Sequence, residues 1–281
     1  MVKKNEKYEF GTFLRRLREA HRVSVSKLGY GLYSPAMISD IESGTRIANN
    51  RMRNRLLARL GVSSAKFADF VQYDEYDRYL LSEKLISYVE NMDRKNASAL
   101  LDTLLKTVDQ SDIVERQLLL DMKARIMSMK GQSPKDIAEV YKTAVSLSLP
   151  DIDYDKLNNY VIADDEYYYI IRQLFFENSL LCNEVNAEDH FEKYRKVISS
   201  IRSSLLVDYT KTNVFPLAVY AFYDAYKKTG SDENLSEQIF HLTDEALTCL
   251  KFVPCAYYLP ELLSARLDLS ERLKKAGISV I

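Results

Sequence analysis

The stretch that decides the fold of the N-terminal region reads Ser34-Pro35-Ala36-Met37-Ile38-Ser39-Asp40-Ile41-Glu42-Ser43-Gly44. Serine followed by proline is typical of a helix start. The serine hydroxyl caps free N–H groups, and proline at the first helical position gives up only an N–H that has no partner. Glycine after the last helical residue is typical of a helix end. The stretch therefore predicts a short helix over residues 35–43.

Three further short helices are predicted around this one. Apolar residues recur at helical spacing over residues 10–21, with charged side chains on the opposite face. Ser24 is a candidate cap for a short helix that ends at Gly29, and a fourth helix runs from about 50 to 60 and is closed by Gly61. Four short helices with a tight turn between the second and third are typical of a helix-turn-helix domain, which binds DNA.

Charge is distributed unevenly along the chain. The 281 residues carry a formal net charge of −1, yet residues 1–66 hold 14 Lys and Arg against five Asp and Glu. The first segment is therefore +9, which leaves −10 on the remainder. A basic end on an acidic body indicates a nucleic-acid-binding end. We predict a DNA-binding domain over residues 1–66 and a second domain over residues 67–281.

The stretch from Leu28 to Gly44 resembles the helix-turn-helix of XRE-family repressors, and more closely that of the Rgg/PlcR-type regulators of Firmicutes. The family pattern is met at Leu28, Gly31, Ser34, Ile38, Ser39, Ile41, Glu42 and Gly44. Asp40 departs from the pattern, which has arginine at that position. The resemblance implies a homodimeric quorum-sensing regulator in which a C-terminal helical-repeat domain binds a short secreted peptide that changes DNA binding or promoter output.

The remainder of the chain is predicted to be helical throughout, so the fold class is all-α. Glycine and proline are scarce, at 8 and 6 residues, and β-branched runs are missing. Apolar periodicity predicts helices over 72–91, 96–108, 111–130, 134–148, 164–183, 187–206, 211–228, 233–250 and 257–275. Their rhythm is typical of an array of helical hairpins, TPR-like in layout although the tetratricopeptide consensus is absent.

Candidate DNA contacts lie on and after the third predicted helix. The N-terminal residues of a recognition helix meet base edges and phosphates in the major groove. The candidates on this helix are Ser34, Pro35, Ala36, Met37, Ser39 and Asp40. Candidate phosphate contacts are Arg46, Arg51, Arg55 and Arg59, the last three of which share one helix face.

Several of these residues have a structural alternative. Asp40 accepts a hydrogen bond from cytosine in one interpretation and pairs with Arg46 or another basic neighbour in the other. The arginine face either binds phosphate or pairs with acidic residues of the body. Ile38 and Ile41 are assigned to the core, and Glu42 to a pairing within the domain.

A concave helical array usually binds peptides or proteins. In the predicted helix 164–183, Asn178 stands in an otherwise apolar row, and a buried amide needs partners that a peptide backbone can supply. In the helix 211–228, tyrosines follow one side and suit ligand recognition. The candidate effector residues are Arg172, Asn178, Asn213, Tyr220 and Tyr223. The alternative is that the asparagine bonds a neighbouring loop and the tyrosines fill space between hairpins.

Enzymatic, metal-binding and membrane functions find no support in the sequence. The segment from Asp151 begins like a calcium loop, but Lys156 and Ile162 occupy the positions that need glycine and glutamate. The histidines and cysteines lack zinc spacing, and we find no phosphate loop, nucleophile elbow, transmembrane run or signal segment. We expect a cytoplasmic regulator without a cofactor, with DNA, a peptide and a second copy as partners. The rival functions are a repressor whose body only dimerises and an interaction scaffold that does not bind DNA.

Overall fold

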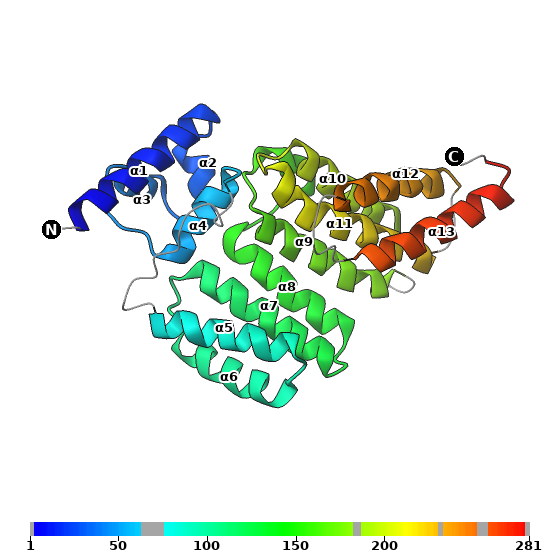
Figure 1. Cartoon of the computed structure of the whole chain (residues 1–281), viewed down its shortest axis with the longest axis horizontal. Helices are drawn as coiled ribbons and strands as arrows, with labels where there is room; N and C mark the ends of the chain where they lie inside the picture. Colours follow the sequence, from blue (N-terminus) through cyan, green and yellow to red (C-terminus); the bar gives the residue numbers. More distant parts are fainter. Residues whose placement is uncertain (1–2, 63–75, 182–186, 230–232, 252–257, 279–281) are drawn as a thin grey trace.

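The computed structural model describes residues 3–62, 76–181, 187–229, 233–251 and 258–278, and all regular secondary structure within them is helical. Residues 3–62 form a head at one end of the molecule, and the later ranges form a curved helical body (Figure 1). The predicted all-α fold class is confirmed. The predicted boundary between residues 66 and 67 lies outside the described residues.

The head consists of α1 (Lys3–Ala20), α2 (Val25–Gly29), α3 (Pro35–Glu42) and α4 (Asn50–Arg59). Side-chain caps define three of the helix starts. Ser24 Oγ accepts from the Lys27 N–H at 3.1 Å and Ser34 Oγ from the Met37 N–H at 3.3 Å. Asn49 begins α4 in the same way. The first helix begins at Lys3, before the predicted start at residue 10. The prediction missed its first turns because they contain charged and polar residues, which leave no apolar period in the sequence.

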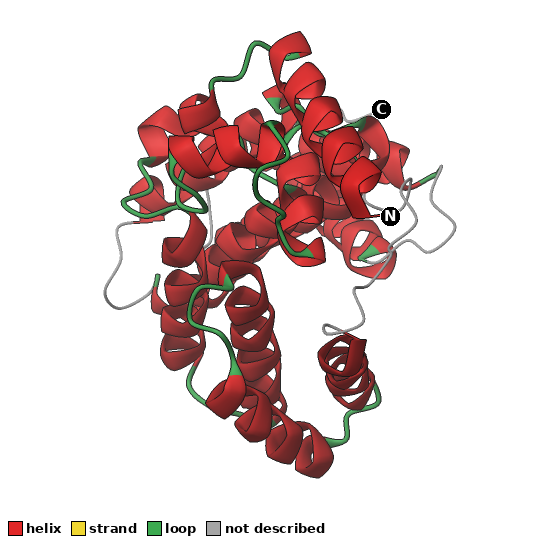
Figure 2. Ribbon diagram, turned by 90° about the vertical axis from the view of Figure 1, so that its left-hand side faces the viewer, coloured by secondary structure: helices red, strands yellow, loops and turns green. Residues whose placement is uncertain are grey.

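The body contains longer helices that pack mainly against their neighbours in the chain (Figures 1 and 2). They are α5 (Tyr76–Glu90), α6 (Arg94–Thr107), α7 (Ile113–Met129), α8 (Pro134–Ser148), α9 (Asp164–Glu177), α10 (Ala187–Ser203), α11 (Asp208–Thr229), α12 (Glu233–Leu250) and α13 (Leu259–Lys275). Short 3-10 helices are η2 (Tyr154–Asn159) and η3 (Asn178–Leu180). Each predicted body helix has an observed counterpart, but the one predicted over 164–183 ends at Glu177 and continues as η3.

The head and the body each have an apolar core, and Val161 of the body also belongs to the core of the head. In the head, Leu14, Leu28 and Leu56 are completely buried together with Ile38 and Ile41, as predicted for the two isoleucines. The body has a large core that runs from α7 to α13 and a smaller one among α5, α6 and α7.

Glu42 pairs within the head, as predicted. Its two carboxylate oxygens accept from Nε and Nη2 of Arg18 at 2.7 and 2.9 Å, and Arg18 also donates to the Val23 carbonyl at 2.9 Å. A two-pronged contact between a guanidinium and a carboxylate is the strong form of this interaction. The pair therefore ties α1 to the end of α3.

Candidate functional site

The N-terminal half of α3 presents an open surface. Ser34, Pro35 and Ala36 are exposed, and Met37 is half-buried. One turn later Ser39 is exposed, and its hydroxyl donates to the Pro35 carbonyl at 3.1 Å. The residues predicted to read bases thus share one accessible patch, which we call the α3 surface.

Asp40 and Arg46 are also exposed beside the α3 surface. Their side chains do not form the ion pair considered as an alternative; the Arg46 N–H donates to the Asp40 carbonyl at 3.1 Å instead. The Arg46 guanidinium carbon lies 6.0 Å from the centre of the Tyr33 ring. Both charged groups therefore remain accessible to a ligand.

Three arginines of α4, Arg51, Arg55 and Arg59, face the body, which corrects the prediction that they bind phosphate. Arg55 and Arg59 are only 2% and 1% exposed. Arg51 Nη1 lies 3.1 Å from Glu115 Oε1, and its Nη2 donates to Ser82 at 2.8 Å. Acidic and polar groups of the body offset the three like charges on this helix face, in agreement with the alternative that the arginine face pairs with acidic residues of the body. In this arrangement Arg55 and Arg59 cannot reach DNA.

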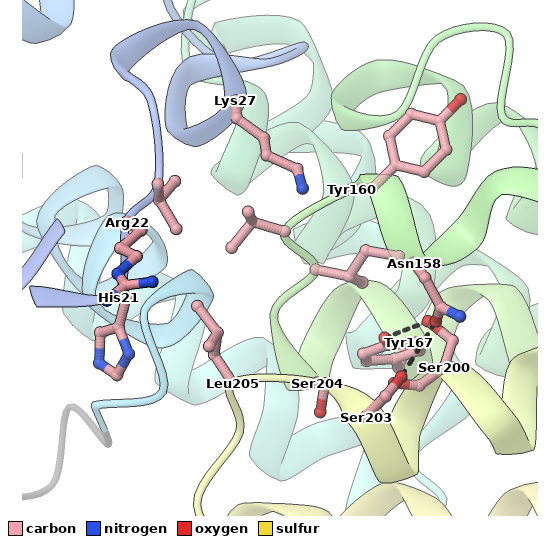
Figure 3. Close-up of a pocket in the computed structure, with 13 residues that line it drawn as sticks. His21, Arg22, Lys27, Asn158, Tyr160, Tyr167, Ser200, Ser203, Ser204 and Leu205 are labelled. Carbon is pink, nitrogen blue, oxygen red and sulfur yellow. Dashed lines mark hydrogen bonds between the residues drawn. The ribbon is translucent and has the colours of Figure 1, made fainter. Parts of the chain in front are cut away.

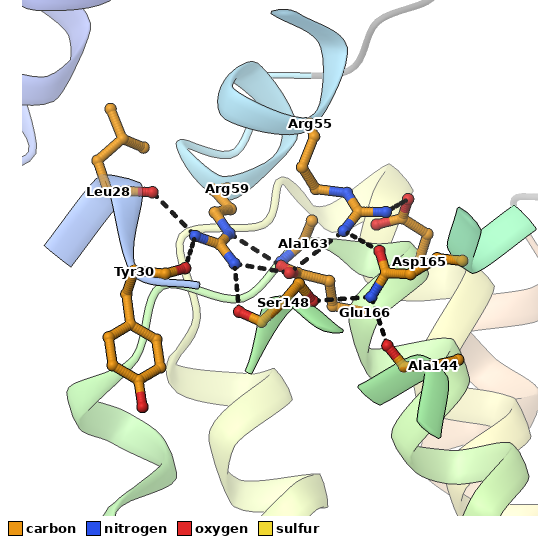
Figure 4. A network of polar contacts seen from close by, with 10 residues as sticks. Leu28, Tyr30, Arg55, Arg59, Ala144, Ser148, Ala163, Asp165 and Glu166 are labelled. Carbon is orange, nitrogen blue, oxygen red and sulfur yellow. Dashed lines mark hydrogen bonds and ion pairs between the residues drawn. The ribbon is translucent and has the colours of Figure 1, made fainter. Parts of the chain in front are cut away.

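Arg59 is the centre of a polar network between head and body (Figure 4). Its Nε and Nη2 donate to the two carboxylate oxygens of Glu166 at 3.0 and 2.7 Å. Its Nη1 donates to the carbonyls of Leu28 and Tyr30 at 2.9 and 2.8 Å, and its Nη2 also reaches the Ser148 carbonyl at 3.2 Å. Every guanidinium nitrogen is thus satisfied by α9, by the end of α8 or by the head itself.

Arg55 extends the same network. Its Nη2 donates to Asp165 at 2.5 Å, and its Nη1 donates to the Gln117 side chain at 2.8 Å and lies 3.2 Å from Glu166. Burial alone would raise the pKa of the Glu166 carboxyl, but Arg59 and Arg55 outweigh burial and hold that pKa at about 2. Glu166 is therefore a full negative charge shared by two arginines.

Two glycines of the head fit closely against the body. Gly31 and Gly61 have φ of +68° and +76°, a region that favours glycine. A Cβ on Gly31 would lie 2.0 Å from the Ser148 carbonyl oxygen, and one on Gly61 would lie 1.9 Å from that of Leu205. The head therefore docks on the body through direct backbone apposition as well as through charge.

Sequence reasoning missed the acidic half of this interface. The available signal was the run Asp164-Asp165-Glu166 at the start of a predicted helix in an acidic body. Three acids cannot specify by themselves which of the head's cations they meet. The partners depend on how the head is seated, and no local pattern encodes that.

Asn178 does not have the predicted role of an effector contact. It is completely buried, and its Nδ2 donates to the Ala221 carbonyl at 3.0 Å and to Asp224 at 2.8 Å. Its Oδ1 lies 2.9 Å from both His190 Nε2 and the Tyr194 hydroxyl. The amide is fully used in joining η3, α10 and α11, so it has no group left for a peptide.

The remaining predicted effector residues are scattered. Tyr223 is 5% exposed and donates to Asp268 at 2.9 Å, so it packs between helices, as the alternative held. Asn213 is exposed, close to the start of α11. Tyr220 is half-buried, and its ring lies 6.1 Å from Phe175 and 6.0 Å from Tyr258.

Arg172 lies among aromatic rings on α9 and α8. Its guanidinium carbon is 5.1 to 5.9 Å from the ring centres of Phe176, Phe175, Tyr141 and Tyr168. Its Nε is buried without a hydrogen-bond partner, and no described Asp or Glu forms an ion pair with it. Phe175 connects this aromatic cluster to Tyr220. Of the predicted effector residues, the structure brings Arg172 and Tyr220 together.

Membrane-crossing helices and metal-binding clusters are absent from the described ranges. No helix there combines the length and apolarity needed to cross a membrane. No group of three or more His, Cys, Asp or Glu side chains within those ranges is placed to hold a metal ion. Cys249 is a free, half-buried thiol, and the other two cysteines lie outside the described residues.

Comparison with known proteins identifies the N-terminal domain and the fold. Residues 9–70 match the helix-turn-helix domain family. A comparison with curated proteins found no match. Among solved structures, PlcR of Bacillus thuringiensis in complex with the peptide PapR7 and DNA aligns over 97% of this chain and 89% of its own, at a TM-score of 0.53 and 11% identity.

Two streptococcal structures align over similar lengths. The apo form of the competence regulator ComR from Streptococcus vestibularis covers 97% of this chain and 99% of its own, at 14% identity and a TM-score of 0.35. The SHP pheromone receptor Rgg2 of Streptococcus dysgalactiae covers 95% and 99%, at 17% identity and a TM-score of 0.36. The match to the helix-turn-helix family over residues 9–70 and the alignment with PlcR establish the fold: a helix-turn-helix domain at the N-terminal end of a chain that has the fold of PlcR.

Proposed function

We propose that this protein is a sequence-specific DNA-binding transcription regulator of the cytoplasm whose helical body binds a short signalling peptide. The observation that carries the proposal is the open α3 surface on a helix-turn-helix domain joined to a body with the fold of PlcR, a protein solved with peptide and DNA. The proposal assigns no catalytic role.

The DNA-reading part of the proposal rests on the α3 surface and Arg46. Ser34, Pro35, Ala36, Met37 and Ser39 would enter the major groove, where small and apolar side chains contact thymine methyl groups and hydroxyls bond to base edges. Asp40 would accept from cytosine N4, and Arg46 would bind phosphate. Arg51, Arg55 and Arg59 are removed from this set because they bind the body.

Selection of binding sites from random duplexes tests the DNA part. Wild type should enrich a defined motif, and Asp40→Arg should change the base preferred at one position of each half-site. Glu90→Arg, which makes the same charge change at an exposed body position, is the control. An unenriched pool, or identical motifs from wild type and Asp40→Arg, would contradict this part of the proposal.

The effector part rests on Arg172. A half-buried guanidinium without a carboxylate partner is costly, and an anionic ligand group offsets that cost with a charge-assisted hydrogen bond. Tyr220 and Phe175 extend the aromatic cluster and suit apolar side chains next to the anion. We therefore propose that a peptide carboxylate binds Arg172.

Peptide binding can be tested by calorimetry with short apolar peptides whose C-terminus is either free or amidated. A charge-assisted hydrogen bond contributes about 1.5–3 kcal/mol, so amidation or Arg172→Met should weaken binding roughly 10- to 100-fold. Arg94→Met removes an exposed arginine of α6 and should have no effect. Equal affinity of both peptide forms for wild type would exclude Arg172 as the carboxylate site.

The dimer part of the proposal is supported by an apolar stripe on α13. Leu259, Leu263 and Leu267 are spaced four residues apart, so they share one face, and they are 36%, 47% and 65% exposed. A second copy covering this stripe would join two heads in one assembly, as recognition of two half-sites requires. Leu263→Lys with Leu267→Lys should convert a dimer to a monomer in light scattering, and a monomeric wild type would refute this part.

A further inference from the structure

A cavity of about 300 Å³ lies where the head meets the body (Figure 3). The α1–α2 turn and α2 form the head side through His21, Arg22 and Lys27. The body side comes from the end of η2 and the segment after it, from α9 through Tyr167, and from the end of α10 with the residues that follow it. The volume is at the small end of the range for ligand sites, and none of the residues described above as DNA or peptide contacts lines it.

The head side of the cavity is cationic. Arg22 and Lys27 have no ion pair within the described ranges, and no Asp or Glu occurs among the described lining residues. Figure 3 shows Lys27 extending from the head into the space between His21 and Tyr160. Positive charges gathered without counter-charges favour an anionic ligand.

Arg22 has a backbone conformation that rarely accommodates a side chain. Its φ is +56°, in the turn two residues after the end of α1, where glycine is the usual choice. The turn is closed by hydrogen bonds of 3.0 Å from the Arg22 N–H to the Glu19 carbonyl and from the Val23 N–H to the Arg18 carbonyl. Glycine would relieve the strain, but it would also remove the cation from the cavity rim.

The body side of the cavity offers hydroxyl and amide groups. The hydroxyls of Tyr167 and Ser200, both 2% exposed, lie 2.7 Å apart. One donates to the other, so the second O–H hydrogen is left without an acceptor among the described residues. The Ser203 hydroxyl lies 3.0 Å from both the Asn158 side-chain oxygen and the Ser199 carbonyl oxygen, and the Asn158 amide hydrogens have no acceptor among the described residues.

We propose that this cavity binds a small phosphate ester that carries hydroxyl groups, of the size of a phosphorylated sugar. The phosphate lies against Arg22 and Lys27, and the ligand hydroxyls bond to the Tyr167–Ser200 pair and to Asn158. A DNA phosphodiester offers the same anionic group but no free hydroxyls to match this wall. Because the ligand contacts both head and body, its binding stabilises the docked arrangement of the two.

The proposal is tested by measuring the thermal unfolding temperature of the full chain with each of five added compounds at equal ionic strength. The compounds are glucose 6-phosphate, ribose 5-phosphate, inorganic phosphate, sulfate and glucose. At least one of the two esters should raise the unfolding temperature more than inorganic phosphate or sulfate, and glucose should have no effect. Equal shifts with both inorganic anions and the esters, or no shift with either ester, overturn the proposal.

Arg22→Gly separates ligand binding from a structural role. Because it relieves backbone strain, the variant should unfold at the same or a higher temperature without ligand, yet bind the ester at least about tenfold more weakly. Lys27→Met should also lower the affinity for the ester, whereas Arg16→Gln, at an exposed position of α1, should leave that affinity unchanged. If Arg22→Gly binds the ester as wild type does, the proposal is wrong. If the variant binds the ester unchanged and lowers the salt slope of DNA binding, the cations contact DNA instead.

Discussion

Replacing Arg59 by methionine should destabilise the protein strongly without touching the DNA surface. Arg59 is 1% exposed, and its guanidinium donates to Glu166 through two nitrogens and to three backbone carbonyls. Removing one partner of a buried ion pair typically costs about 3–5 kcal/mol, because the other charge stays buried. That is a large share of the roughly 5–15 kcal/mol that stabilises a typical protein.

Urea unfolding, followed separately by a probe in the head and a probe in the body, measures this cost. Arg59→Met should lower the midpoint and separate the two transitions, because the head loses its main attachment to α9. Glu166→Gln should act in the same direction from the body side. The double variant Arg59→Met with Glu166→Leu should recover much of the loss, since it removes one buried charge of each sign and leaves Arg55 paired with Asp165.

The salt dependence of DNA binding provides the control. Each phosphate contact adds about 0.9 to the slope of log affinity against log salt, and a buried arginine adds nothing. Arg59→Met should therefore keep the wild-type slope. A loss of stability below about 1 kcal/mol, or a slope reduced by about one contact, would refute the assignment of Arg59 to the interface.

Three further predictions concern other parts of the molecule. Gly61→Ala should weaken head docking and lower the urea midpoint, because its Cβ would lie 1.9 Å from the Leu205 carbonyl oxygen. Gly131→Ala, at φ +67° with no atom within 4 Å of its Cβ, should cost only about 1 kcal/mol of backbone strain, and equal effects of the two substitutions on the midpoint would contradict this. Burial, aided by Lys193, lowers the pKa of the His190 ring from 6.5 to about 4. The folded state therefore favours the neutral ring, so the stability that His190 contributes is complete above pH 6.5 and falls by roughly 3 kcal/mol as the pH drops to 4. His190→Gln should make the urea midpoint less dependent on pH over that range, and parallel midpoint-against-pH curves for variant and wild type would contradict this. Arg46→Ala should weaken binding to all duplexes alike and reduce the salt slope by about one contact, which titration at several salt concentrations checks.

Local rules were enough to predict the head and most body helices. Ser34 with Pro35, and Gly44 at φ +76°, mark the ends of α3 because capping is a short-range interaction. Apolar spacing located Ile38 and Ile41 in the core for the same reason. The start of α1 was missed because a polar, basic segment has no apolar period, and helix propensity alone does not mark a boundary.

The candidate sites were harder to predict because their residues meet only in the folded chain. Arg55 and Arg59 lie on a basic face, and their sequence does not distinguish DNA phosphate from the carboxylates of Asp165 and Glu166. Asn178 was interpreted as a ligand contact because its partners are distant in sequence, on α10 and α11. Polar groups with long-range partners are thus the positions where pattern reasoning fails.

The central claim is that the α3 surface reads DNA sequence. Its most direct test is the ratio of two affinities, one for a selected duplex and one for a shuffled duplex of the same composition. For wild type we predict a ratio on the order of 10³ or more at physiological salt. Ala36→Glu, which places a negative charge on the α3 surface without entering the core, should reduce the ratio toward one while the urea midpoint stays unchanged. A wild-type ratio near one, or an undiminished ratio in Ala36→Glu, would contradict the claim.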